Sequence, residues 1–171
     1  RMARKVMITG KGRCNLTNCC DVATLIANIP RNPRFLYSAF NAFTPQDTMA
    51  LIEAQGVPLK VERGNRVFPV SDKAVDVVDA LVRFAHDKGV RFTHGRVQHL
   101  CLADGVCTGV TLESGETLTA DAVILATGGK SYPQTGSEGD GYALAREAGH
   151  TVIDPRPSLV PLESSDGYCA A

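Results

Sequence analysis

Apolar residues recur at helical spacing in four stretches of the chain. The clearest is residues 71–89, SDKAVDVVDALVRFAHDKG, where valines and leucines share one face and a glycine follows the last turn. Residues 44–56, TPQDTMALIEAQG, begin with a capping threonine, a first-turn proline and an early aspartate. Shorter helices are predicted from about residue 33 and over residues 139–149, the latter ending at a glycine.

Other stretches carry the patterns of strands. The apolar runs KVMITG (residues 5–10) and DAVILATGG (121–129) predict buried strands, the second covered on both faces as in a parallel sheet. Residues 57–70 predict a hairpin turning at a Gly-Asn pair. Residues 90–100 restart a strand pattern, and three short strands follow with Asp-Gly and Ser-Gly turns. The order predicts an α/β domain with an antiparallel meander inserted before its last parallel strand.

Composition narrows the class of protein. The 171 residues carry 18 basic and 18 acidic side chains, so no basic excess is available for a general nucleic-acid surface. No apolar run is long enough for a membrane span, and we expect no membrane contact. The six cysteines lack CxxC spacing, which favours a reduced, cytoplasmic setting and disfavours a zinc site. The chain begins at Arg1 and ends in SSDGYCAA, from which we expect a piece of a longer protein.

Three glycine-containing loops are candidates for ligand binding. Gly10–Asn15 and Ala126–Gly129 follow predicted strands, where small residues let a ligand approach the backbone, and Thr135–Gly141 opens the last helix. The N–H groups at that helix start can meet an anion, and the guanidinium of Arg13 suits phosphate oxygens. Each loop alone also fits an ordinary turn. Together they favour a nucleotide-like ligand.

Several segments resemble a known family. ITGKGRCNLTN, FLYSAF, VERGNRVFPVSDKA and DAVILATGGKSYPQTGSEGDGYALAREAGHTV, in this order, resemble the BaiN-like (YhiN-like) FAD-dependent oxidoreductases, also described as aminoacetone oxidase-like flavoproteins. The resemblance covers nearly the whole chain. It implies a Rossmann-like fold built from two dinucleotide-binding halves, with FAD as cofactor. It also implies NAD(P)H or an organic donor as the hydride source, and a small-molecule substrate such as oxygen or an activated double bond as the acceptor.

The resemblance further implies which residues contact FAD. The first loop would lie near the pyrophosphate and flavin, and Val97 would meet the adenine side through its backbone. The second loop would form a close-approach turn, and Asp140 in the third would bind a ribityl hydroxyl. The implied cofactor-binding residues are Gly10, Gly12, Arg13, Cys14, Asn15, Asn18, Val97, Ala126, Thr127, Gly128, Gly129, Gly139, Asp140 and Gly141. No residue is assigned as a catalytic acid, base or nucleophile, and none as a metal ligand.

The sequence departs from the family pattern at two points. The family begins with a strand, a G-x-G-x-x-G/A loop and a helix, none of which is present here. Glu138 stands where the family has a small hydroxyl residue, and a carboxylate beside a diphosphate is repelled, so we expect Glu138 to point outward or to alter the local fit. We expect residues 1–155 to form a partial FAD-binding domain and residues 156–171 to begin a second, inserted domain.

Three alternatives remain open at the level of sequence. A succinate dehydrogenase or fumarate reductase-like flavoprotein shares the GDG helix start, although GRCNLTN weighs against it. The chain could also be a non-catalytic segment that holds no FAD by itself, because the diphosphate loop is missing. A cysteine-dependent metal or redox module is disfavoured by the cysteine spacing. For Cys14, packing as a small buried side chain near the flavin is favoured over a redox role.

Overall fold

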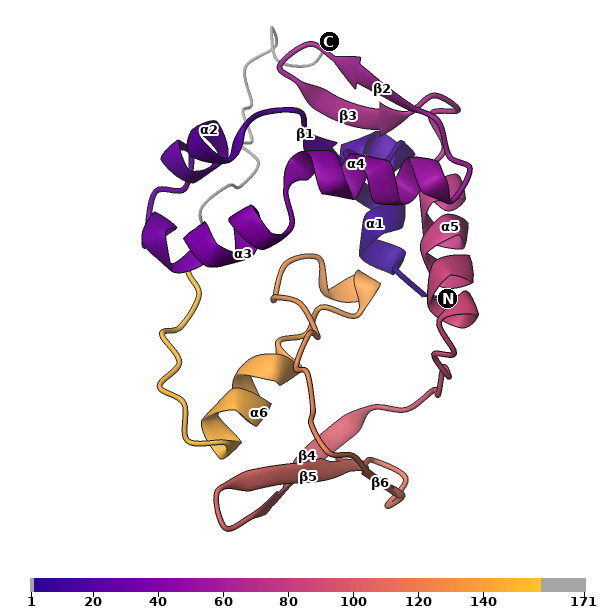
Figure 1. Cartoon of the computed structure of the whole chain (residues 1–171). Coiled ribbons are helices and arrows are strands. Elements are labelled where there is room, and N and C mark those ends of the chain that lie inside the picture. The colour runs from indigo at the N-terminus through magenta and orange to yellow at the C-terminus, as the bar shows by residue number, and fades with distance from the viewer. Residues whose placement is uncertain (1, 158–171) are drawn as a thin grey trace, which may run out of the picture. The chain divides into compact units, whose positions relative to one another are not determined.

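The computed structural model describes residues 2–157, and the chain divides into two compact units, Arg1–Thr93 and His94–Ala171 (Figure 1). Each unit combines helices with its own antiparallel sheet of three strands. The chain is therefore an α/β protein, as predicted. Within residues 2–157, no helix has both the length and the apolar character needed to cross a membrane.

The first unit contains most of the helices. Its sheet has the strand order β1-β3-β2, and every neighbouring pair in it is antiparallel. The predicted hairpin is confirmed, since β2 and β3 pair across the Gly-Asn turn. The elements are α1 (Arg4–Ile8), η1 (Thr9–Gly12), β1 (Thr17–Asn18), α2 (Val22–Ala27), η2 (Pro33–Leu36), α3 (Tyr37–Ala42), α4 (Pro45–Ala54), β2 (Leu59–Glu62), β3 (Arg66–Pro69) and α5 (Ala74–Asp87).

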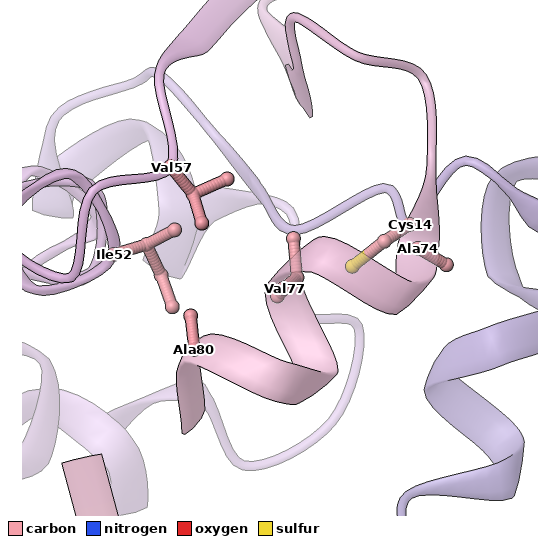
Figure 2. Packing of buried hydrophobic residues seen from close by; sticks show 6 residues of the cluster. All are labelled: Cys14, Ile52, Val57, Ala74, Val77 and Ala80. Atoms are coloured by element: carbon pink, nitrogen blue, oxygen red, sulfur yellow. The ribbon is translucent and has the colours of Figure 1, made fainter. Parts of the chain in front are cut away.

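The two long predicted helices form as expected, and their apolar faces make the core of this unit. Helix α4 begins with a complete capping box, in which the Thr44 hydroxyl accepts from the Asp47 N–H at 3.1 Å and Asp47 accepts from the Thr44 N–H at 2.8 Å. Figure 2 shows the core between α4 and α5, where the side chains of Ile52 and Val57 face Val77 and Ala80. Cys14, from the loop after η1, lies beside the start of α5 in the same cluster.

The prediction of a strand over residues 5–10 is wrong. These residues form α1 and the start of η1, and Val6 and Met7 pack against the core cluster. A six-residue apolar run is compatible with a strand or with a buried helical turn, because periodicity alone does not separate the two. Here the apolar side chains reach the core from a helix.

The second unit is built on the predicted meander. Its strands are β4 (Val97–Ala103), β5 (Val106–Leu112) and β6 (Thr117–Thr119), paired antiparallel in chain order. The β4–β5 turn places Asp104 and Gly105 at φ +50° and +78°, the left-handed conformation that an Asp-Gly pair adopts readily in tight hairpins. After the meander come η3 (Pro133–Thr135) and α6 (Asp140–Glu147).

The predicted buried strand over residues 121–129 is not formed. This segment has no strand pairing, and the residue Ile124 is 91% exposed. A strand of a parallel sheet is covered on both faces and pairs with parallel neighbours. All strand pairs among residues 2–157 are antiparallel, so no such neighbour is present in the described part of the chain. The predicted second domain over 156–171 lies almost entirely outside the described residues.

Candidate functional site

The first glycine loop is a tight turn in left-handed conformation. Gly10, Gly12 and Cys14 have φ values of +57°, +85° and +63°, a region that residues with a β-carbon rarely adopt. A β-carbon added to Gly10 would lie 2.8 Å from both the Asn15 nitrogen and Cε1 of Phe68, which is too close for any side chain. Position 10 therefore requires glycine for its conformation and for space.

Arg13, which follows η1, contacts Glu62 at the end of β2 and Asp72 just after β3, in a cluster of alternating charges. Its Nη1 is 3.0 Å from Glu62 Oε1 and 3.3 Å from Asp72 Oδ1, and its guanidinium carbon lies 4.1 Å from the centre of the Phe68 ring. Lys60 Nζ is 2.7 Å from Asp72 Oδ2. The hydrogen bond to Glu62 raises the pKa of Arg13, while Arg13 lowers the pKa of Glu62 and Lys60 lowers that of Asp72. The guanidinium is thus shared between two ionised carboxylates.

The other predicted residues of this loop differ in burial. Cys14 is only 3% exposed, and burial raises the pKa of its thiol, so it packs as a neutral side chain. The burial predicted for Cys14 is confirmed, and its position near the flavin stays a prediction. The amide of Asn18 donates to the Gly64 carbonyl at 2.8 Å and so holds β1 to the hairpin turn, whereas Asn15 is exposed.

In the second unit, the other two glycine loops lie against each other. A β-carbon added to Gly141 would overlap Oγ1 of Thr127, so a larger residue at the start of α6 requires the Thr127 side chain to shift. A β-carbon on Gly128 would lie 3.8 Å from Oγ of the buried Ser137, and one on Gly129 3.7 Å from the Tyr142 hydroxyl. The structure therefore brings the predicted residues of these two loops together.

Val97 and Asp140 line one open hollow of about 670 Å³ between β4 and α6. Arg96 holds the Asp140 carboxylate with two bonds, Nη2 to Oδ1 at 2.7 Å and Nε to Oδ2 at 3.0 Å. The same Nη2 is 2.9 Å from Glu138 Oε2, and the hydrogen bond to Asp140 raises the pKa of Arg96. Glu138, expected to point outward or disturb the site, is half-exposed and pairs with Arg96, which it shares with Asp140 and Glu113.

The structure thus collects the predicted residues into two groups, one in each unit. That one ligand contacts both groups stays a prediction. Sequence reasoning missed the partners that fix the charged members: Glu62, Asp72 and Phe68 around Arg13, and Arg96 beside Asp140. Ion pairs can be expected from the charged residues of VERGNRVFPVSD, but which residues pair depends on how the hairpin packs. Among residues 2–157, no three His, Cys, Asp or Glu side chains are placed to hold a metal ion.

Comparison with known proteins identifies similar chains. The family described as "HI0933-like protein Rossmann domain" matches residues 1–164. The chain is 37% identical over 164 residues to a "3-dehydro-bile acid delta(4,6)-reductase" of Clostridium scindens, covering 95% of this chain and 39% of the relative. It is 34% identical over 159 residues to a "Ribosomal RNA dihydrouridine synthase" of Escherichia coli, covering 92% and 38%. An "L-aspartate oxidase" of Saccharolobus solfataricus is 33% identical over 90 residues, 48% of this chain and 19% of the relative. The chain spans about two fifths of the length of the first two relatives.

Proposed function

Because the chain belongs to the HI0933-like Rossmann domain family, we propose that it forms part of the FAD-binding region of an oxidoreductase. The names of two relatives, a reductase and an oxidase, support electron transfer as the reaction type. The segments that resemble FAD-dependent oxidoreductases support FAD as the cofactor. The flavin would supply the redox chemistry when bound, and this chain's residues would bind and orient it.

The loops of the second unit fit a cofactor that approaches the backbone closely. The observation that carries the proposal is the second loop beside the start of α6, where Gly129 keeps the backbone open although neither its conformation nor its packing requires glycine. No side-chain hydrogen bond caps the N-terminus of α6, so an acceptor on the cofactor would find uncapped N–H groups there.

The hollow beside these loops fits the hydroxyl-bearing part of the cofactor rather than its diphosphate. Carboxylates accept hydrogen bonds from hydroxyl groups and repel phosphates. Arg96 holds the Asp140 carboxylate with two hydrogen bonds at the hollow, and Val97 lines the same hollow. This agrees with Asp140 binding a ribityl hydroxyl.

For the substrate, we propose an unsaturated ring that is reduced at an activated carbon–carbon double bond. Two relatives have names that describe adding hydrogen to such a bond, a delta(4,6)-reductase and a dihydrouridine synthase, and each covers more than nine tenths of this chain. NAD(P)H is the proposed electron donor. The second candidate is an oxidase that passes electrons to oxygen, favoured by the shorter similarity to L-aspartate oxidase.

The cofactor is tested by purifying the protein that contains this chain and recording its visible absorbance. We expect bound flavin, and we expect Asp140→Asn to weaken FAD binding by about tenfold or more because a charged hydrogen-bond acceptor is lost. Asp154→Asn is the matched control, since Asp154 is an exposed carboxylate of the same unit that pairs with Arg146. A folded protein without flavin absorbance, and unable to bind added FAD, would refute the proposal.

The donor and acceptor are tested on the flavin-loaded protein without oxygen. NADH or NADPH should bleach the flavin absorbance, and an unsaturated cyclic ketone should restore it. If neither nucleotide bleaches the flavin, NAD(P)H is not the donor. Restoration by oxygen but by no unsaturated compound would favour the oxidase.

A further inference from the structure

We propose that Arg13 is a positioning residue, which fastens the Gly10–Cys14 turn to the β2–β3 hairpin and does not itself bind the anionic part of the cofactor. Glu62, Asp72 and Phe68 are its partners in this role. The inference rests on the proposed function, because it concerns how this turn is prepared for FAD. It replaces the expectation from sequence that the guanidinium meets phosphate oxygens.

The geometry around Arg13 engages the Nη1 donor and one face of the guanidinium. Nη1 donates to both oxygens of Glu62, at 3.0 and 3.2 Å, and to Asp72 at 3.3 Å. The flat guanidinium stacks on Phe68, which is 1% exposed and therefore held rigidly by the core. A planar cation that donates hydrogen bonds and also stacks on a ring is the chemistry that distinguishes arginine from lysine.

The charge balance of the cluster argues against a phosphate at this point. Arg13 and Lys60 contribute two positive charges, and Glu62 and Asp72 contribute two negative ones, with Lys60 bonded to Asp72 at 2.7 Å. A phosphate that reached Arg13 would come close to both carboxylates, which repel it. It would also compete with the hydrogen bonds that Nη1 already donates to these two carboxylates.

The turn needs stabilising contacts because its backbone dihedral angles are energetically unfavourable by themselves. Lys11 and Cys14 adopt φ values of +60° and +63° although both carry a β-carbon. The Phe68 ring lies under Gly10, whose absent β-carbon would be 2.8 Å from Cε1, and the same ring lies under Arg13. One buried ring and one ion cluster thus support both ends of the turn.

The two possible roles of Arg13 predict opposite effects of removing its carboxylate partners. FAD affinity is measured for two variants of the protein containing this chain. The first carries both Glu62→Gln and Asp72→Asn, and the second carries Arg13→Gln alone. A positioning role predicts that both weaken FAD binding by roughly two- to fivefold, the range expected of a partly exposed ion cluster. It also predicts that a variant carrying all three substitutions binds FAD only a little more weakly than either of the two, because both remove one shared interaction. If loss of the carboxylates tightens FAD binding or leaves it unchanged while Arg13→Gln weakens it, Arg13 is an anion ligand and the inference is overturned.

A second measurement tests the fastening without cofactor. Amide hydrogen exchange of residues 10–15 should accelerate by roughly two- to fivefold in Arg13→Gln and in Glu62→Gln, and less in Arg13→Lys, which keeps the charge. Glu53→Gln, an exposed carboxylate change on α4, is the control and should leave exchange unchanged. Unchanged exchange in the Arg13 and Glu62 variants would overturn the inference. This result is independent of FAD, so a failure of the proposed function is distinguishable from a failure of the positioning role.

Discussion

Replacing Gly10 with alanine should destabilise the first unit by more than the usual cost of losing a turn glycine. Two effects add. Holding alanine at φ +57° costs about 1–2 kcal/mol. The new β-carbon would lie 2.8 Å from the Asn15 nitrogen and from Cε1 of Phe68, and relieving such overpacking costs about 1–3 kcal/mol. We therefore expect a loss of about 2–5 kcal/mol in the free energy of unfolding, measured by urea denaturation.

Gly64→Ala is the matched control for this prediction. Gly64 has φ +76° in the hairpin turn of the same unit, and a β-carbon there would meet nothing within 4 Å. Only the conformational cost of about 1–2 kcal/mol applies to it. The difference between the two variants isolates the contact with Phe68 and Asn15. Equal losses of unfolding free energy would refute the reasoning that close packing requires glycine at position 10.

Three further predictions follow from particular contacts. Gly141→Ala should destabilise the second unit by about 1–3 kcal/mol because its β-carbon overlaps Oγ1 of Thr127, and adding Thr127→Ala should restore most of the loss in urea denaturation. The carboxylates of Glu62 and Asp72 have pKa values below their ordinary 4.5 and 3.8, so their contribution is complete above about pH 4.5 and is lost as the pH falls through the lowered values. Melting temperatures of the wild type and of a Glu62→Gln, Asp72→Asn variant should therefore converge in that acidic range and differ at neutral pH. Iodoacetamide should alkylate Cys14 more slowly than the partly exposed cysteines of residues 2–157, because burial raises the pKa of its thiol, and equal rates by peptide mapping would contradict this.

The fold was predictable where local signals decide it. Helix α4 carries its own cap and α5 its own apolar face, and the β4–β5 turn needs only an Asp-Gly pair. The two apolar runs at residues 5–10 and 121–129 lack such signals, because an apolar run takes its conformation from its neighbours. The first packs on the core as a helix, and the second has no strand beside it among residues 2–157.

The candidate site also contains features that could be predicted from the sequence and features that could not. The positions of its glycines could be predicted, since glycine at a turn is visible in the sequence. The partners of Arg13 and Asp140 could not, because Glu62 is 49 residues from Arg13, and Arg96 is 44 residues from Asp140. Such pairs form only when separate elements pack. For this reason the sequence predicted Arg13 as a phosphate ligand, whereas in the structure its side chain is ion-paired with Glu62 and Asp72.

Gly129 is the predicted site glycine that the fold of residues 2–157 explains least. Its φ is outside the left-handed region, and an added β-carbon would make only an ordinary contact, 3.7 Å from the Tyr142 hydroxyl. Gly10 and Gly141, in contrast, are required by the packing of the chain itself. The proposed function accounts for such a glycine, because a cofactor can approach its backbone closely. Gly129→Ala should therefore change the free energy of unfolding by less than about 0.5 kcal/mol, the range of a neutral substitution, while weakening FAD binding in the protein that contains this chain. Unchanged FAD affinity would show that the cofactor does not approach this turn, and a large loss of stability would show that the fold itself requires the glycine.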